Sequence, residues 1–159
     1  MTTSAELDMA TMTVTPGGNA STTLTVRNDS DIVEAYELEV VGECADWTTV
    51  VPARVSLYPG TAETVTVQLA PPRSPDVHAG EVPLGVRVLP VERPESVVVP
   101  ETTVRIEAFD DLRANLVPHR RRGWFGARYV VSVRNQGNTL ADVALTATQP
   151  GEELRFGVT

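Results

Sequence analysis

The chain has few of the residue types from which catalytic and metal centres are built. Its 159 residues include one cysteine, Cys44, and two histidines, His78 and His119. A single thiol cannot close an internal disulfide, so Cys44 is predicted to be a partly buried small residue. The histidines stand in no HxH, HExxH or cysteine–histidine spacing, and no zinc site is predicted.

The familiar catalytic motifs are absent as well. The sequence contains no GxSxG and no glycine-rich phosphate loop after a strand. Three carboxylates, Glu34, Glu37 and Glu39, fall on a predicted strand, and we interpret them as solvent-facing residues. A glycosidase carboxylate pair depends on a three-dimensional separation, but a small domain without a deep cleft is a poor host for one. We therefore predict no catalytic residue, no cofactor and no enzymatic activity.

Long apolar runs are missing too. No apolar run approaches the ~20 residues of a membrane span. The N-terminus lacks the basic and apolar regions of a secretory signal. The expected location is the cytoplasm or the cytoplasmic face of a membrane, with any membrane contact made through a segment outside this chain. Alternatively, the chain is cut from a longer protein.

Lysine is absent, and all thirteen basic residues are arginine. We interpret this as the codon bias of a GC-rich, actinobacterial genome. The net charge of −8 is uneven, because residues 1–108 carry 16 acids and 6 arginines, whereas residues 109–159 carry 5 acids and 7 arginines. An acidic first part argues against nucleic acid as a partner, since phosphate binding needs a basic face. It also argues against direct binding of that part to anionic lipid.

One phrase occurs twice in the sequence. Residues 24–41 read LTVRNDSDIVEAYELEVV and residues 131–147 read VSVRNQGNTLADVALTA. Each has an alternating apolar run that ends in Val-Arg-Asn, a short polar turn and a second alternating run. A unit that returns after roughly a hundred residues predicts two copies of one small β domain.

Short alternating runs between turn residues predict strands along the whole chain. They lie at residues 5–15, 20–28, 33–41, 46–51, 53–58, 61–69, 81–91 and 96–108, and then at 112–119, 126–134, 140–147 and 153–158. The predicted fold class is all-β, with one complete immunoglobulin-like (Ig-like) antiparallel β-sandwich over residues 5–108 and an incomplete second unit over 109–159. A half-sandwich leaves an open edge, so either the chain is truncated or another chain supplies the missing strands.

Several turn and core motifs follow one another in a characteristic order. They are Thr15-Pro16-Gly17-Gly18, Val26-Arg27-Asn28, Trp47 before Val50-Val51-Pro52, Leu57-Tyr58-Pro59-Gly60, and Pro71-Pro72 through Ala79-Gly80. This order resembles bacterial Ig-like modules of the NEW3 type, also described as NPCBM-associated domains. The resemblance implies a non-catalytic accessory module. Similar tandems form the N-terminal part of actinobacterial membrane-anchored "hydrolytic protein" homologues, some encoded beside phage-tail-like contractile injection machinery.

A basic stretch in the second unit is the candidate partner-binding site. Arg120, Arg121 and Arg122 stand beside Trp124 and Phe125 in a predicted loop. Guanidinium groups next to aromatic rings suit an acidic protein partner or a sugar ring. Two other interpretations remain: a solvated arginine turn with Trp124 in a second core, and docking of the loop against the acidic first unit.

Two features of the first unit have ordinary structural interpretations. Asn28-Asp29-Ser30-Asp31 offers several oxygen ligands, but calcium needs six to eight of them. A turn stabilised by Asn and Asp side chains is the simpler interpretation, so no metal site is predicted. Trp47 is predicted to lie in the core, as a large aromatic does in most small sandwiches.

The predicted function is that of a non-enzymatic assembly or attachment module that binds protein, within a larger membrane-anchored protein. The partner assembly is suggested to be contractile injection machinery. One alternative is a carbohydrate-associated module of a cell-wall enzyme. A second is a structural protein whose incomplete unit is completed by strands from another chain.

Overall fold

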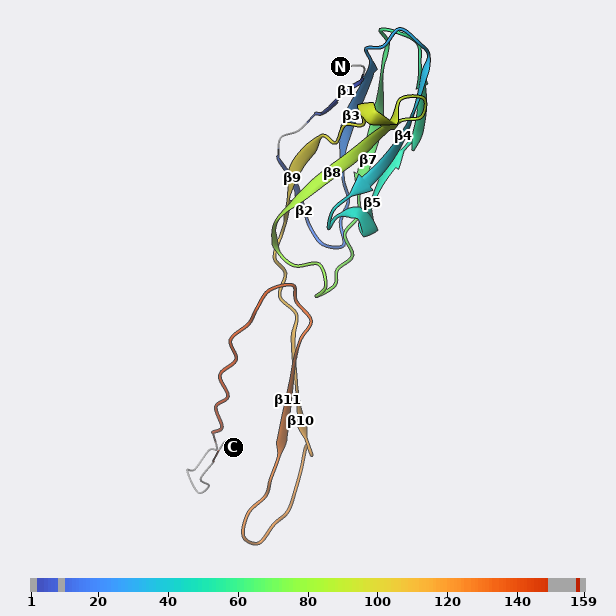
Figure 1. Cartoon of the computed structure of the whole chain (residues 1–159). Coiled ribbons are helices and arrows are strands. Elements are labelled where there is room, and N and C mark those ends of the chain that lie inside the picture. Colours follow the sequence, from blue (N-terminus) through green and yellow to red (C-terminus); the bar gives the residue numbers. More distant parts are fainter. Residues whose placement is uncertain (1–2, 9–10, 149–156, 158–159) are drawn as a thin grey trace.

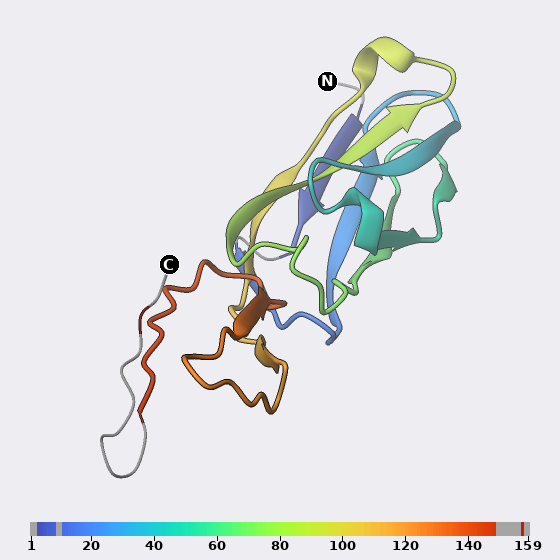
Figure 2. The same cartoon turned by 90° about the horizontal axis from the view of Figure 1, so that it is seen from below.

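The computed structural model describes residues 3–8, 11–148 and 157, and within them it is an all-β protein. Two sheets pack face to face as a sandwich, and a hairpin projects from one end (Figures 1 and 2). The first sheet has the strand order β1 (Thr3–Leu7), β3 (Ala20–Asn28), β7 (Ala62–Leu69), β5 (Thr48–Val51). The second has the order β2 (Thr11–Val14), β9 (Glu101–Ile106), β8 (Gly80–Pro90), β4 (Glu34–Val41), β6 (Arg54–Leu57). The hairpin consists of β10 (Leu112–Val117) and β11 (Val130–Asn135).

Helical structure in the described residues is confined to single 3-10 turns. These are η1 (Ala45–Trp47), which leads into β5, and η2 (Pro94–Ser96), which lies between β8 and β9. No helix in this part of the chain has the length and hydrophobicity to cross a bilayer. The predicted all-β sandwich is confirmed.

The N-terminal segment contributes to both sheets. The sequence predicts one edge strand over residues 5–15, and this prediction is wrong, because β1 lies in the first sheet and β2 in the second. Beyond β1, the backbone N–H of Asp8 donates to Thr23 O at 2.9 Å. β2 runs parallel to β9, whereas the other described strand pairs are antiparallel. One short strand thus covers an edge of each sheet, which limits the exposed backbone groups there.

The break predicted at Pro52 is confirmed. β5 ends at Val51, and β6 begins at Arg54. Proline has no N–H to give to a strand ladder, so a sheet strand cannot continue through it as a central strand. The chain uses this point to cross from the first sheet to the second.

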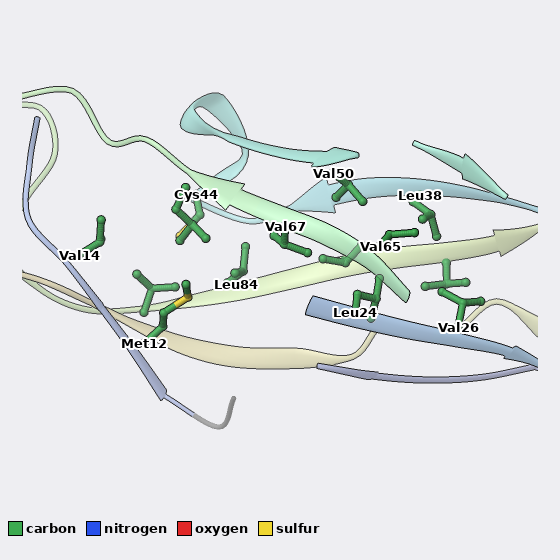
Figure 3. Close-up of a cluster of buried hydrophobic side chains, with 14 of the residues drawn as sticks. Met12, Val14, Leu24, Val26, Leu38, Cys44, Val50, Val65, Val67 and Leu84 are labelled. Atoms are coloured by element: carbon green, nitrogen blue, oxygen red, sulfur yellow. The ribbon is translucent and has the colours of Figure 1, made fainter. Parts of the chain in front are cut away.

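The core lies between the two sheets and is built by every second residue of their strands (Figure 3). Leu24 and Val26 of β3 have no exposed surface, and Val65 and Val67 of β7 are buried beside them. Tyr36 of β4 is the largest fully buried side chain from the opposite sheet. Each such aliphatic side chain contributes about 1.5–3 kcal/mol relative to the exposed state. These buried positions follow the alternation of apolar residues within the strands predicted at residues 20–28 and 61–69.

Strand β4 contains the clearest error in predicted burial. Glu34 is predicted to face solvent, but it is buried, and its neighbour Val33 is exposed. Glu34 shares the inward face of Tyr36, because side chains of a strand alternate with period 2. Its Oε1 accepts the backbone N–H groups of Ala35 (3.1 Å) and Glu92 (2.9 Å). The buried carboxyl group is thus hydrogen-bonded, as buried polar groups usually are.

The other two acids of β4 face solvent as predicted. Arg54 Nη1 lies 4.0 Å from Glu37 Oε1, and Arg87 pairs with Glu39. Each arginine stands directly opposite its acid on the neighbouring strand. Exposed pairs of this kind contribute about 0–1 kcal/mol to stability. Their position favours a role as cross-strand surface pairs.

The second unit forms fewer strands than its sequence predicts. β10 and β11 match the strands expected at 112–119 and 126–134. Residues 140–148 lie in no strand, although their sequence alternates, so the strand predicted there is wrong. An alternating run forms a strand only where a neighbouring strand accepts its backbone groups. The strand predicted at 153–158 lies outside the described residues, apart from Gly157, which is in no strand.

Candidate functional site

The five residues predicted to bind a partner lie together in one loop at the far end of the hairpin. The loop, residues 118–129, joins β10 to β11 (Figure 1) and is called the tip below. Trp124 is 98% exposed and Phe125 is 105% exposed. The interpretation of Trp124 as a core residue is therefore wrong. Two large aromatic side chains in water are unusual, and such exposure commonly marks an interaction site.

The three tip arginines, Arg120, Arg121 and Arg122, form no ion pair with the described acids. Arg121 Nη1 donates to Arg128 O at 3.3 Å, across the loop. The ion pairs of the described residues all involve other arginines. Figure 1 places the tip at the end of the hairpin farthest from the sandwich, so docking of the loop on the acidic first unit is not observed.

The hairpin as a whole is strongly basic. Residues 112–135 contain six arginines and no aspartate or glutamate. The nearest acid in sequence, Asp111, accepts from Arg113 Nε at 3.2 Å at the base of the hairpin. The positive charge therefore increases toward the tip, which favours an acidic surface as its target.

The hairpin has the same register as the first two strands of the first sheet. Asn28, the last residue of β3, lies opposite Thr3, the first residue of β1. Asn135, the last residue of β11, lies opposite Leu112, the first residue of β10. The phrase that occurs twice in the sequence thus forms the same antiparallel pair twice.

The β1–β3 pair and the β10–β11 hairpin differ in how far the rest of the described chain buries their apolar side chains. Counted from the asparagine, Val131 and Val133 of β11 occupy the positions of Leu24 and Val26 of β3. The β3 residues are 0% exposed, whereas Val131 is 43% exposed and Val133 is 36% exposed. The first sandwich supplies β7 and a second sheet to cover β3, and the described residues supply neither to β11. An apolar strip along the hairpin is therefore left in water.

The asparagine of the repeated phrase is a turn-forming residue in both copies. Asn28 Oδ1 accepts the N–H two residues ahead at 2.9 Å, and its Nδ2 donates to the carbonyl four residues ahead at 2.8 Å. Asn135 makes the same two bonds at 2.9 and 2.7 Å. Asn28 is buried and also donates to Leu57 O at 2.9 Å, whereas Asn135 is exposed. The turn is thus local, and its burial comes from the complete sandwich.

The turn after β11 fastens the hairpin to the sandwich through Asn138. This buried side chain accepts the N–H of Phe109 at 2.8 Å and donates to Glu107 O at 2.9 Å. Its backbone O accepts the N–H of Ala79 at 3.1 Å. The guanidinium of Arg73 lies 4.1 Å from the centre of the Phe109 ring. A turn is predicted here but the junction is not, because no pattern in one sequence marks which turn residue is buried.

Both aspartates in the turn after β3, Asp29 and Asp31, pair with arginines of the chain. Asp29 accepts from Ser4 Oγ at 2.8 Å and from Arg27 Nε at 2.7 Å, and these bonds lower its pKa. The pKa of Asp31 is lowered by its own backbone N–H and by Arg93, whose Nη2 lies 3.0 Å away. Within the described ranges, no three His, Cys, Asp or Glu residues are grouped as metal ligands. The turn interpretation fits these contacts.

Cys44 is a buried thiol beside the second sheet. It has no exposed surface, and its Sγ lies 3.6 Å from Pro83 O. Burial raises the pKa of this thiol to about 11, with a smaller contribution from the charge of Glu43. The thiolate, which is the reactive form, is scarce at neutral pH. Cys44 is therefore a packing residue.

Trp47 lies at the edge of the core and is only partly buried, which corrects its predicted place inside. Its exposed part lines an open groove of about 680 Å³ together with Asn19, Asp46, Thr49 and Gln68. The groove thus combines an aromatic surface with side chains that can donate and accept hydrogen bonds.

No protein-family model and no curated protein sequence matches the chain. Among solved structures, a family 123 glycoside hydrolase from Clostridium perfringens is similar, with a TM-score of 0.52 and 9% identity over 67% of this chain and 27% of that one. The fold is an Ig-like β-sandwich. Two further similar structures are PapD-like domain 7 of human CEP192 (TM-score 0.43, 14% identity, 65% of this chain and 83% of that) and the Salmonella enterica SafA pilin with its SafB chaperone (0.43, 13%, 65% and 54%). At these identities the likeness concerns the fold alone.

Proposed function

We propose that the chain is a non-catalytic attachment module that binds a protein partner through its second unit. The observation that carries this proposal is the exposed apolar strip of the hairpin, which leads to a tip of arginine and aromatic residues. Tryptophan and arginine are enriched among the residues that dominate binding energy at protein interfaces. The excess of positive charge favours an acidic protein surface.

The setting we propose is a larger, membrane-anchored actinobacterial protein of which this chain is an N-terminal part. The module would be of the NEW3 type and act in the cytoplasm or at the cytoplasmic membrane face. Its partner would be a protein assembly such as contractile injection machinery. The support for this setting is the sequence resemblance, with which the Ig-like sandwich agrees. The 16 acids and 6 arginines of residues 1–108 argue against nucleic acid as a partner of the first unit.

Removal of the tip charges is expected to weaken partner capture without unfolding the sandwich. With residues 1–159 as bait in an extract of the source organism, the variant Arg120→Ala/Arg121→Ala/Arg122→Ala should retain about tenfold less of the specific partner, a loss of about 1.4 kcal/mol. Thermal unfolding of the first unit should be unchanged, since none of the three side chains contacts it.

The matched control changes the same amount of charge elsewhere. Arg54→Ala/Arg87→Ala/Arg105→Ala removes three exposed arginines from the sandwich and should capture the partner as the native chain does. Equal loss in both triple variants would show that total charge matters and not the tip. Equal capture by the tip variant would remove the tip from the proposed function.

The second candidate function is carbohydrate binding in the groove beside Trp47. In a Trp124→Phe background, Trp47 is the remaining indole, so its fluorescence reports the groove directly. Soluble cell-wall oligosaccharides should shift this emission, and Gln68→Ala in the groove should abolish the shift. Thr64→Ala, on the same strand but outside the groove, is the control. Constant emission at millimolar sugar would eliminate this candidate.

A further inference from the structure

We infer that the outer face of the second sheet binds an amphipathic helix of another protein, one with basic residues beside its apolar stripe. The surface lies on the first unit and is separate from the tip, so this is a second binding site beyond the proposed function. A band of exposed apolar side chains and an excess of acidic residues beside it point to this kind of partner.

Six apolar side chains lie on the outer face of the second sheet. Alternation along the chain directs them outward, since the residue beside each one, such as Glu34, Leu57 or Val98, is turned toward the core. Five of the six are between 40% and 70% exposed, and Leu89 is partly exposed. Neighbouring apolar side chains left in water on a sheet face commonly mark an interaction site. The six are called the apolar band below and are Val33, Tyr58, Leu89, Val91, Val97 and Val99.

One end of the apolar band is formed by β4 and β6. Glu34, the first residue of β4, lies opposite Leu57, the last residue of β6. Val33 precedes Glu34 and Tyr58 follows Leu57, so the two apolar side chains stand next to each other on the outer face. This end lies beside the turn between β3 and β4, at the end of the sandwich away from the hairpin (Figure 1). The exposure of the band is therefore a property of the first unit.

The rest of the band is formed by β8 and the segment that follows η2. Val91 donates its N–H to Ala35 O at 2.9 Å, so it lies beside β4. The antiparallel bridge between β8 and the segment after η2 places Val97 opposite Leu89. Val99 comes two residues later and has the same outward direction. The apolar side chains thus form one continuous band over β6, β4, β8 and this segment.

The shape of the band fits a single helix. The band crosses the sheet obliquely from the end of β6 to residues 97–99. At about 3.3 Å per residue along the strands and about 4.8 Å from each strand to the next, it is roughly 24 Å long. An α-helix of about 16 residues has this length. A second sheet would also have to cover the charged pairs Glu37–Arg54 and Glu39–Arg87 beside the band, whereas one helix does not.

The surface is held in place before any partner binds. Glu34 Oε1 accepts the N–H of Glu92 at 2.9 Å, which ties the start of β4 to the end of β8. Arg93 Nη2 donates to Asp31 Oδ1 at 3.0 Å, which joins the same two loops at the surface. These contacts fix the two loops that carry Val33 and Val91. A preformed surface loses little conformational freedom on binding, so less of the contact energy is spent on ordering it.

The charges beside the band decide between partners. Three arginines there are paired with acids of the same surface. Three further glutamates form no ion pair with the described arginines: Glu92, Glu95 and Glu101. This excess of negative charge disfavours an anionic membrane and the same face of a second copy. It attracts lysine or arginine beside the apolar stripe of a helix, so the occupant is a basic amphipathic helix.

The probes are three peptides of about 16 residues, made of leucine, alanine and lysine and titrated into residues 1–159. The first places its leucines on one side of a helix, with lysines beside them. The second has the same composition, but its leucines are spread around the helix. The third is the first peptide with glutamate in place of lysine. Calorimetry measures binding, and the amide chemical shifts of the chain locate the bound peptide.

The first peptide should bind and shift the amides of β4, β8 and residues 97–99. The other two should bind at least about tenfold more weakly at low salt, because the second lacks an apolar stripe and the third is repelled by the acids. Equal binding of the two lysine peptides would mean that charge alone attracts them, which would overturn the inference. Absence of binding, tighter binding of the glutamate peptide, or shifts confined to the first sheet or the hairpin would also overturn it.

A matched pair of substitutions tests the band itself. Val33→Lys places a positive charge in the band, and Val51→Lys places one on β5 of the first sheet, where the native valine is 53% exposed against 52% for Val33. Val33→Lys should bind the first peptide about tenfold more weakly, whereas Val51→Lys should bind it as the native chain does. Both variants should melt as the native chain does.

Equal binding by the two variants would overturn the inference, as would self-association of the native chain that Val33→Lys removes. The proposed function is tested separately, because the tip variant Arg120→Ala/Arg121→Ala/Arg122→Ala should bind the first peptide as the native chain does. If the peptides fail while partner capture still depends on the tip, the proposed function stands and the helix site does not.

Discussion

Replacing Val26 with aspartate is expected to leave the first unit unfolded. The same replacement at Val133 is expected to change the free energy of unfolding of the first unit by less than about 0.5 kcal/mol. The two valines occupy the same place in the repeated phrase, but Val26 is 0% exposed and Val133 is 36% exposed. An unpaired carboxylate at Val26 would be enclosed by aliphatic side chains, and this costs more than about 4 kcal/mol. A loss of this size approaches the whole stability of a domain at the lower end of the usual range of about 5–15 kcal/mol.

The measurement is urea unfolding of both variants, followed by circular dichroism. Val26→Ala is the graded control, since it removes two buried methyl groups without adding charge and should cost about 2 kcal/mol. A folded Val26→Asp protein with an unchanged midpoint would show that the two sheets do not enclose β3. A large loss in Val133→Asp would show that the hairpin face is covered in solution.

Replacing Asn28 with alanine is expected to destabilise the first unit by about 2–4 kcal/mol, while Asn135→Ala costs less than about 1 kcal/mol. Asn28 donates to Ile32 O and Leu57 O and accepts the N–H of Ser30, all near or inside the core. Its removal leaves buried backbone groups without partners. Asn135 makes only the two local bonds, in a position that water reaches.

Asn28→Asp separates the two halves of the side chain. It retains an acceptor for Ser30, but it loses both donated bonds and places a buried carboxylate against the carbonyl oxygens of Ile32 and Leu57, so it should be no more stable than Asn28→Ala. Differential scanning calorimetry of the three variants gives the comparison directly. Equal costs at Asn28 and Asn135 would mean that the local turn, rather than its burial, carries the stabilisation.

The sequence predicts the strands of the first unit well because each buries one face. In β3 and β7 the alternation is regular, and both faces are assigned correctly. β4 fails at its start, where Glu34 is inward and Val33 outward. The prediction follows the general preference of acids for solvent, although the period-2 alternation of the strand places Glu34 on the inward face. A hydrogen-bonded acid at the end of a strand is stable inside the core. The sequence also does not predict which sheet a short strand joins, because alternation is the same in either sheet. β1 and β2, which join different sheets, are examples.

The candidate site was predictable in part. A run of three arginines beside two aromatics is visible in the sequence, and the structure brings all five side chains into one exposed loop. The exposed apolar face of β11 follows less directly, because it depends on which of the described strands pack against it rather than on a motif. The burial of Asn138 was not predicted, since it is produced by residues distant in sequence, such as Ala79.

The junction at Asn138 makes the hairpin a lever arm. Six residues in each strand carry the tip roughly 20 Å from its base, at about 3.3 Å per residue. Asn138 ties the base of the hairpin to Ala79 and Phe109. The orientation of the hairpin is therefore set by the sandwich, unlike that of a segment joined by a flexible linker. If several copies lie side by side, hairpins of fixed orientation bring their tips to the same assembly at a high local concentration. Several weak contacts then add up to a high overall affinity.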